Sequence, residues 1–273
     1  MTEITNVTGT AFVVAEYRDE ENRAVEPLYR DYFVSLFLSP ESRRAADRAA
    51  AGFPLVKELV KLRTRHLDDR LDKQIAAGCR QVVVLGAGLD TRAVRKSSAG
   101  VTYFEIDDAA TLGLKRARLA EHGMLGDTHF IAGNYVNDGL IALLLMNGFD
   151  PELPTYVIWE GNTMYLPLAC DKAILRQLKG SLKRFQVSFD YFACAMIGLR
   201  TGVPGLTRMA VNFESMNAPW ITGFDDIAAL AAEMDLSVIE DVTTGELHCT
   251  YRPRTAVPVF GPFYSICTLA SGN

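Results

Sequence analysis

One segment, QVVVLGAGLDTRAVR at residues 81–95, limits what this chain can fold into and what it can bind. Its apolar residues 82–85 are typical of a strand buried on both faces, and glycines directly after a strand let the backbone approach a ligand closely. Dinucleotide sites have a small residue at the position of Thr91, and the Asp90 carboxylate would repel a pyrophosphate. The turn therefore favours a nucleoside cofactor without phosphate over NAD.

The segments after this turn alternate between strand and helix patterns. This alternation predicts an α/β fold with a mainly parallel sheet covered on both faces. The stretch 243–261 between the last two strands contains no predicted helix, so one of these strands should run antiparallel. The predicted strands are 81–85, 101–107, 128–133, 155–160, 184–192, 236–242 and 262–270, and the predicted helices are 108–123, 138–147, 171–182 and 224–235.

The first eighty residues have helical patterns instead. Leucines and an isoleucine recur every three to five residues between Leu55 and Ile75, with Pro54 at the start of this helix and Gly78 just past its end. We therefore expect a single domain of residues 1–273. It would consist of a helical cap (1–78) and an α/β core (79–273) with an insertion at about 195–224.

An acidic residue ends the second predicted strand. Asp107 lies 21 residues after Gly86, where a carboxylate can accept hydrogen bonds from ribose hydroxyls, and Glu105 precedes it on the same face. Asp108 is the better candidate to cap the helix that follows. S-adenosylmethionine contains an adenosine and no phosphate, so it satisfies both the glycine turn and this acid.

Composition narrows the classes of partner. The net charge of −5 and the pI near 5.5 disfavour a nucleic-acid surface. Residues 1–9 lack the features of a signal peptide, and the apolar run 140–146 is too short for a membrane span, so we expect a cytoplasmic protein without membrane contact. The five cysteines show no metal-binding spacing, and we expect reduced thiols and no metal.

Several strings together resemble the leucine carboxyl methyltransferase family. They are TGTAFVVAEYR (8–18), RTRHLDD (63–69), VVVLGAGLDTRAVR (82–95), TYFEIDDAATLGLKRARL (102–119) and GFDPELPTYVIWEGNTMYLP (148–167). The resemblance runs from about residue 8 to 170 and continues weakly at 222–243. It implies S-adenosylmethionine as the methyl donor and a class I methyltransferase fold, a Rossmann-like seven-stranded sheet with an antiparallel last strand. The family includes the protein phosphatase methyltransferase and bacterial carboxyl methyltransferases that tailor polyketides.

The resemblance also implies roles for residues that match the family strings. Arg63 would bind the methionine carboxylate through its planar guanidinium, with Arg65 and Arg18 as the alternatives. Gly86 and Gly88 would lie against the methionine portion of the cofactor, and Asp107 under its ribose.

Two further family positions concern the adenine and the edge of the sheet. The family's Asp-Leu pair, which reads adenine, is replaced by Asn134 and Tyr135, unless the alignment shifts and Asp138 is the partner. The Asn134 carbonyl can still accept a hydrogen bond from the adenine amino group. Glu160 matches the family acid near the bound cofactor, or else caps the helix that starts near Leu168.

The acceptor pocket should lie beneath the N-terminal helices and the segment 197–224. This segment is rich in Gly, Pro, Met and aromatic residues, as in a mobile lid over an apolar ligand. Candidate pocket walls are Tyr165, Phe213 and Trp220, and Arg200 or Arg208 could attract an acid.

Methyl transfer to a carboxylate needs proximity and alignment but no catalytic residue, because the carboxylate is already ionised. The leading hypothesis is therefore a carboxyl O-methyltransferase acting on a small-molecule acid of secondary metabolism, as a monomer or a homodimer. A hydroxyl acceptor would need a base, for which the histidines at 66, 122, 129 and 248 are candidates. Three competing hypotheses are methylation of a protein C-terminal carboxylate, a non-catalytic S-adenosylmethionine-binding module and an NAD-dependent oxidoreductase.

Overall fold

The computed structural model describes residues 8–51, 53–215 and 217–272 of the chain. The first seven residues of the predicted cap therefore lie outside the described residues. The same holds for most of the segment 1–9, which we expected not to be a signal peptide. No helix in the described ranges is long and apolar enough to cross a membrane.

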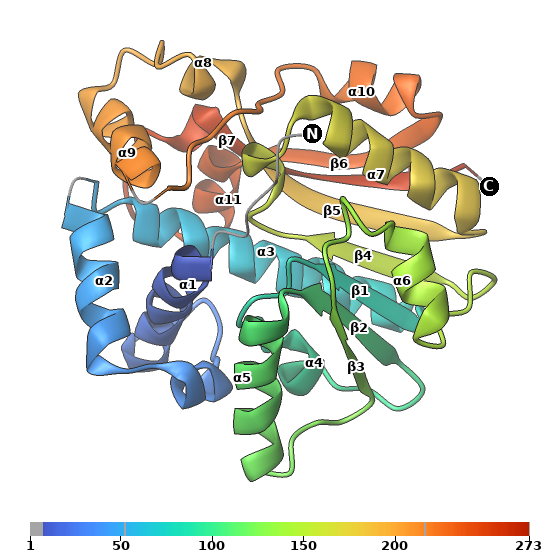
Figure 1. Cartoon of the computed structure of the whole chain (residues 1–273). Coiled ribbons are helices and arrows are strands. Elements are labelled where there is room, and N and C mark those ends of the chain that lie inside the picture. Colours follow the sequence, from blue (N-terminus) through green and yellow to red (C-terminus); the bar gives the residue numbers. More distant parts are fainter. Residues whose placement is uncertain (1–7, 52, 216, 273) are drawn as a thin grey trace.

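Seven strands form one sheet in the order β3-β2-β1-β4-β5-β7-β6 (Figure 1). Strands β1 to β5 pair in parallel, whereas β7 pairs antiparallel with both β5 and β6. This confirms the predicted, mostly parallel sheet with an antiparallel last strand. The strands are β1 (Gln81–Leu85), β2 (Thr102–Asp107), β3 (Thr128–Ala132), β4 (Thr155–Trp159), β5 (Phe185–Phe192), β6 (Leu236–Thr243) and β7 (Tyr264–Ser271).

Helices precede the sheet in the chain and also cover it. The α-helices are α1 (Thr8–Glu20), α2 (Pro40–Ala51), α3 (Val56–Ala76), α4 (Arg92–Arg95), α5 (Ala109–Glu121), α6 (Leu140–Met146), α7 (Leu168–Ser181), α8 (Cys194–Ile197), α9 (Pro204–Ser215), α10 (Ile227–Glu233) and α11 (Thr244–Tyr251). The 3₁₀ turns are η1 (Glu21–Arg23), η2 (Tyr32–Phe37), η3 (Thr163–Tyr165) and η4 (Gly261–Phe263).

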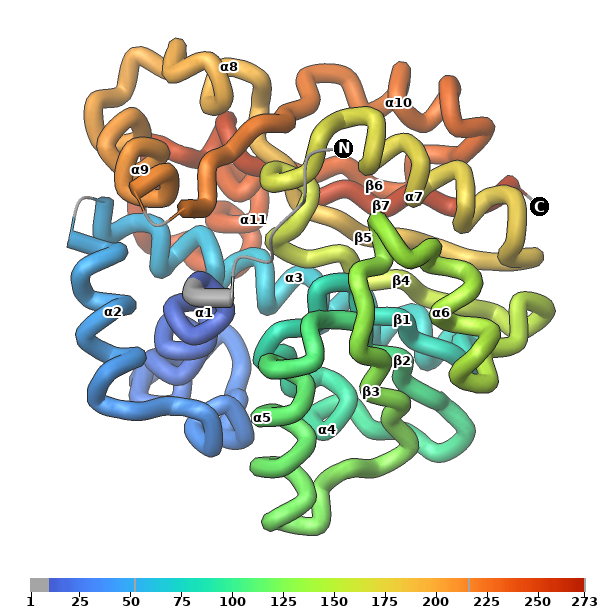
Figure 2. The backbone as a smooth tube through the Cα atoms, in the orientation of Figure 1, coloured from blue at the N-terminus to red at the C-terminus, as the bar shows by residue number. Residues whose placement is uncertain are grey.

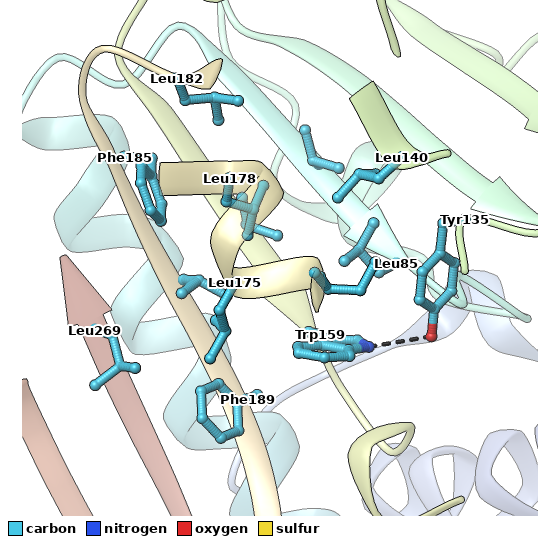
Figure 3. Close-up of a cluster of buried hydrophobic side chains, with 14 of the residues drawn as sticks. Leu85, Tyr135, Leu140, Trp159, Leu175, Leu178, Leu182, Phe185, Phe189 and Leu269 are labelled. Atoms are coloured by element: carbon cyan, nitrogen blue, oxygen red, sulfur yellow. Dashed lines mark hydrogen bonds between the residues drawn. The ribbon is translucent and has the colours of Figure 1, made fainter. Parts of the chain in front are cut away.

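The two faces of the sheet have separate cores because successive side chains of a strand point to opposite faces. Val83 and Leu85 of β1 pack with buried residues of α6, α7 and α10. Val82 and Val84 of the same strand pack with α3, α4, α5 and α11. Figure 3 shows the first of these cores, in which the Trp159 indole N–H donates a hydrogen bond to the Tyr135 hydroxyl. Burial on both faces explains the unbroken apolar run of β1.

A third core joins the N-terminal helices to the inserted segment. Apolar residues of α1, α2 and the start of α3 pack with α9 and with Phe192 and Tyr264, which lie at the end of β5 and the start of β7. Figure 2 shows α1, α2 and α9 lying together beside the sheet. The sequence thus folds its first helices and its insertion into one layer over the carboxyl ends of the strands.

The stretch between the last two strands differs from the prediction. Residues 243–261 contain helix α11, which starts with a capping box between Thr243 and Glu246. The inference of an antiparallel strand was right, but its premise that no helix lies there was wrong. This helix packs on the side of the sheet that α3 and α5 cover, without making a parallel crossover. The Thr-x-x-Glu spacing was the available sequence signal.

One acidic residue is buried in this fold without a partner. Asp171 of α7 is 1% exposed, and neither of its carboxylate oxygens has a hydrogen bond with the described residues. Burial raises the pKa of Asp171 to about 9. The folded protein therefore holds a proton here that the unfolded chain releases above about pH 4.

This proton makes stability depend on pH with a definite sign. Between about pH 4 and 9 the folded state binds more protons than the unfolded state at this group, so the free energy of unfolding falls as pH rises, by at most about 1.4 kcal/mol per pH unit. Asp171→Asn removes this loss. We expect urea titrations to show equal stability near pH 4.5 and an increasingly more stable variant towards pH 9. Asp47→Asn, at an exposed position of α2, is the control. An unchanged difference between pH 4.5 and 9 would contradict the prediction.

Candidate functional site

A cavity of about 500 Å³ lies at the carboxyl ends of β1, β2 and β4. Residues of α1 and of the segment 217–221 line its other side, beneath the cap and the insertion as predicted. Its volume falls within the range of small-molecule sites, about 300–1,000 Å³. The predicted site residues that line it are Arg63, Gly86, Gly88, Asp107, Asn134, Tyr135, Glu160 and Tyr165.

The glycine turn forms a cradle that side chains would fill. Gly86 and Gly88 have φ angles of +62° and +46°, which favour glycine. A Cβ on Gly86 would overlap the Asn162 side chain, and one on Gly88 would lie 3.3 Å from Ala11 Cβ of α1. The turn can therefore take a ligand against bare backbone only because both positions are glycine.

The carboxylate at the end of β2 faces the same cavity. Asp107 Oδ2 accepts a hydrogen bond from Gly88 N at 2.5 Å, and Oδ1 accepts one from Asp108 N at 2.6 Å. Burial raises the pKa of Asp107 above its usual value. Asp108 caps α5 by accepting from Ala110 N and Thr111 N, as predicted. These bonds fix Asp107 in place while further lone pairs stay available to hydroxyl donors.

Glu105 does not belong to the cavity lining. It pairs at 2.6 Å with Lys115 of α5, and both side chains are at most 1% exposed. Burial raises the pKa of Glu105 to about 7. This acid is part of the contact between α5 and the sheet.

Arg63 is held by three side chains at the edge of the cavity. Its Nε donates to Glu160 Oε1 at 2.7 Å, and its Nη1 donates to Asp190 Oδ2 at 3.0 Å and to the Tyr264 hydroxyl at 2.7 Å. No hydrogen bond joins its Nη2 to any residue that the structure describes. This nitrogen is therefore the part of Arg63 that a ligand carboxylate could bind.

Glu160 bridges two arginines rather than capping a helix. Its second oxygen pairs with Arg92 Nη1 at 2.6 Å, and α7 begins at Leu168, after Pro167, with no side-chain cap. Burial opposes ionisation of Glu160, but the charges of Arg92 and Arg63 hold its pKa below the usual value. The alternative role as a cap for α7 is thereby excluded.

Arg92 is a residue of this site that the sequence patterns did not identify. It is 1% exposed and also pairs with Asp68 of α3 at 2.7 Å and with Asp90 at 2.5 Å. Its signal was present in the string LDTR, where the buried acid Asp90, in the turn after β1, stands two residues before the arginine. The network joins the cap helix α3 to the ends of β1 and β4.

The two alternatives to Arg63 lie in different places. Arg18 of α1 lines the cavity, where it pairs with Asp31 at 3.2 Å. Arg65 lies outside the lining, is 38% exposed and pairs with Asp69. Arg18 is therefore the alternative that the geometry retains.

Asn134, the predicted adenine contact, lines the cavity but uses its side chain locally. Asn134 Oδ1 already accepts hydrogen bonds from Val136 N and Asn137 N at 3.0 and 3.2 Å. Its carbonyl is thus occupied by the local turn and is no ready acceptor for an adenine amino group. Asp138 accepts from Asn134 N at 2.7 Å and is not part of the lining. Tyr135 lines the cavity with its hydroxyl bonded to Trp159.

The remaining acceptor-side candidates lie outside the described cavity lining. Phe213 is 8% exposed, and its ring centroid lies 5.0 Å from that of Trp220, which packs on Phe192 at 4.3 Å. Apolar packing thus draws both rings into the core behind the cavity wall. Arg200 folds back over Gly198 and is exposed, and Arg208 lies on α9. Among the described residues of the insertion, the cavity is lined instead by Asn217, Pro219 and Ile221.

The charge of the lining decides which ligand fits. Four carboxylates, of Asp90, Asp107, Asp108 and Glu160, face two guanidinium groups, of Arg18 and Arg63, among the described lining residues. An excess of negative charge repels phosphates and attracts a cation. The bare glycine turn, the ribose acid and this charge fit S-adenosylmethionine, whose sulfur is positively charged.

Comparison with known proteins agrees with this assignment. A sequence model of leucine carboxyl methyltransferase matches residues 11–179. A Frankia alni protein provisionally named an S-adenosyl-L-methionine-dependent methyltransferase is 33% identical over 216 residues, which are 76% of this chain and 72% of that protein. Further curated relatives with the same provisional name match over 56–67% of their own length.

Solved structures resemble the whole fold at low identity. A DUF574 family protein from Streptomyces avermitilis has a TM-score of 0.67 at 16% identity, over 96% of this chain and 97% of that chain. Magnesium protoporphyrin IX methyltransferase from Synechocystis, crystallised with bound SAH, has a TM-score of 0.51 at 12% identity, over 96% of this chain and 99% of that chain. These likenesses confirm the predicted class I methyltransferase fold.

Neighbouring acids after β2 allow a matched test of the ribose contact. Asp107→Ala removes charge-assisted hydrogen bonds, so we expect its dissociation constant for S-adenosylmethionine to rise about tenfold or more. Asp108→Ala loses the cap of α5, which costs about 1 kcal/mol of stability, with a much smaller change in affinity. Titration calorimetry and thermal unfolding of both variants separate the two effects. An Asp107→Ala variant that folds and binds with the affinity of the unaltered protein would show that Asp107 does not contact the ligand.

Two arginines of α3 allow a second matched test. Arg63→Ala leaves Glu160 and Asp190 short of a cation, which should lower the free energy of unfolding by about 3–5 kcal/mol. It should also weaken binding of S-adenosylmethionine. Arg65→Ala, which removes a partly exposed pair, should cost under about 1 kcal/mol and leave affinity unchanged. Urea unfolding and calorimetry measure both quantities. A folded Arg63→Ala variant with unchanged affinity would transfer the carboxylate-binding role to Arg18.

Proposed function

The chain belongs to the leucine carboxyl methyltransferase family and is an S-adenosylmethionine-dependent methyltransferase, and we propose that its acceptor is the carboxylate of a small apolar acid. The observation that carries this proposal is the state of the acids around the cavity. Every carboxylate in the described lining is engaged by main-chain or guanidinium donors. Asp107 keeps further lone pairs, but the ribose hydroxyls would use them, so no acid is left to take a proton from an acceptor.

The choice between acceptors follows from proton chemistry. A hydroxyl must lose its proton as the methyl group arrives, and a base assists this step. The four histidines, at 66, 122, 129 and 248, are absent from the described lining of the cavity. A carboxylate is already ionised at neutral pH, so it needs only alignment and exclusion of water. The lack of an available base supports a carboxylate acceptor.

This chain's residues divide the work of holding the donor. When bound, S-adenosylmethionine supplies a methyl group on a cationic sulfur that leaves as a neutral thioether. Arg63 Nη2 would bind its amino-acid carboxylate, the turn from Gly86 to Gly88 would lie against the methionine chain, and Asp107 would accept from the ribose hydroxyls. Tyr135 would pack on the base. Burial raises the pKa of the Tyr165 hydroxyl to about 12, so this group stays protonated and can donate to an acceptor carboxylate.

The wall on the acceptor side indicates the kind of acid. Ala11 and Val14 of α1, with Pro219 and Ile221, give it an apolar character. A wall of this kind favours an acid whose single charge is the reacting carboxylate. The cover formed by α1 and the insertion leaves room for a small molecule, and we propose an acid of secondary metabolism, such as a polyketide acid, in a cytoplasmic enzyme.

Pairs of acids and alcohols with the same carbon skeleton test the proposal. The protein is incubated with S-adenosylmethionine labelled in the methyl group and with benzoic acid or benzyl alcohol, and likewise with octanoic acid or octanol. We expect label in the acids only, released as volatile methanol by base because methyl esters hydrolyse. Label that appears in the alcohols and survives base would overturn the proposal in favour of a hydroxyl acceptor.

A further inference from the structure

Asn162 lies at the position where an asparagine usually caps the helical turn that follows, but its side chain does not cap that turn. It is the residue before η3, and asparagine at such a position usually accepts a hydrogen bond from the turn that follows. Its side chain makes no cap hydrogen bond and lines the cavity instead. It lies within the family string at 148–167, in which the resemblance assigns it no role.

Main-chain carbonyls fix the orientation of the Asn162 amide. Its Nδ2 donates to Glu160 O at 2.6 Å and to Leu85 O at 3.2 Å, at the ends of β4 and β1. Because only the nitrogen can donate to carbonyl oxygens, this pattern identifies which amide atom is Oδ1. The oxygen must then point away from both strand ends.

A short relay of hydrogen bonds also holds this oxygen. The Trp159 indole N–H donates to the Tyr135 hydroxyl at 3.1 Å, as Figure 3 shows, and that hydroxyl donates to Asn162 Oδ1 at 3.3 Å. Trp159 is fully buried, so the relay is anchored in the core. An amide oxygen can accept two hydrogen bonds, and Tyr135 supplies one of them.

The position of Asn162 Oδ1 places it near the middle of the donor. A Cβ on Gly86 would overlap this oxygen, so it stands directly against the turn that would hold the methionine chain. Its other neighbour, Tyr135, stands where the base would pack. The sulfur of S-adenosylmethionine joins its methionine chain to its adenosine, so with the donor held in this way the oxygen would face the surroundings of the sulfur.

We propose that Asn162 recognises the positive charge of the donor, its fixed carbonyl dipole contacting the carbons bound to the sulfonium. The inference rests on the proposed use of S-adenosylmethionine. A dipole held in place by three partners interacts with a cation without reorganising, and C–H groups next to a positive sulfur are good partners for a carbonyl oxygen. The neutral product loses this attraction, so Asn162 favours binding of the donor over the demethylated product.

An aspartate could not fill this position without a cost to the site. Its carboxylate would face the carbonyl oxygens of Glu160 and Leu85 with no proton to donate. It would also add a fifth negative charge to a lining that already contains four carboxylates. The amide supplies a negative end towards the ligand and donors towards the backbone within one side chain.

The test compares two ligands that differ by one methyl group and by the positive charge that this group gives to the sulfur. Dissociation constants for S-adenosylmethionine and S-adenosylhomocysteine are measured by calorimetry on the full chain and on Asn162→Ala and Asn162→Asp. In Asn162→Ala the preference for the charged ligand should fall about tenfold, the usual size for a lost interaction with a charged group. In Asn162→Asp the preference should rise, even if both affinities fall.

The matched control applies the same chemical change elsewhere on the cavity wall. Asn134→Ala should weaken both ligands by similar factors and leave their ratio unchanged. Asn162 is only half-buried, so its variants should fold, and thermal unfolding verifies this. A ratio that is unchanged in either folded variant would overturn the proposal, since a merely structural role moves both affinities together. If the unaltered protein binds neither ligand, the use of S-adenosylmethionine fails instead.

Discussion

The site depends on the way Glu160 divides its two oxygens between Arg63 and Arg92. One arginine comes from the cap helix α3 and the other from α4, after β1, while Glu160 itself directly follows β4. Three segments of the chain therefore meet at one carboxylate. Burying charged carboxylate and guanidinium groups costs free energy because they lose their water. Their mutual attraction offsets this cost only when the geometry is good. The network is better understood as a means of positioning than as a source of stability.

The same network sets the electrostatic character of the cavity. The guanidinium groups are committed to carboxylates, so little positive charge is left to attract an anion. Among the described residues, Asp107 accepts hydrogen bonds from main-chain N–H groups and has no paired cation, so its charge is uncompensated at the ligand face. Because the arginines are paired with carboxylates, the negative charge that remains in the cavity favours a cationic ligand. The Asn162 carbonyl extends this preference to the position of the sulfur.

Local patterns predicted much of this architecture. The buried strand, its glycines and Asp107 follow one another within a single β-α-β unit, where spacing alone relates them. Helix α11 was missed because a short helix with a weak apolar stripe resembles a loop unless its capping box is read. The ion network was missed for a different reason: Glu160 lies 97 residues from Arg63 and 68 from Arg92, and no local pattern relates such positions.

Asn162 shows a further limit of sequence patterns. Its local preference is to cap the turn that follows, and only the folded neighbourhood of Leu85, Tyr135 and Gly86 draws the side chain elsewhere. Of the three aromatic candidates only Tyr165 lines the cavity, because composition cannot tell a ring that lines a cavity from one packed behind it. Phe213 and Trp220 are large and apolar, and the core competes for such side chains.

The antiparallel strand β7 has a consequence for the order of assembly. Tyr264, its first residue, accepts a hydrogen bond from Arg63, although 201 residues separate them. Because β7 is inserted between β5 and β6, the sheet cannot close around this contact while residues 264–271 are still within the ribosome. A nascent chain would thus have its glycine turn and its helices before it could orient Arg63. Donor binding should therefore follow the insertion of β7, as a property of the closed sheet.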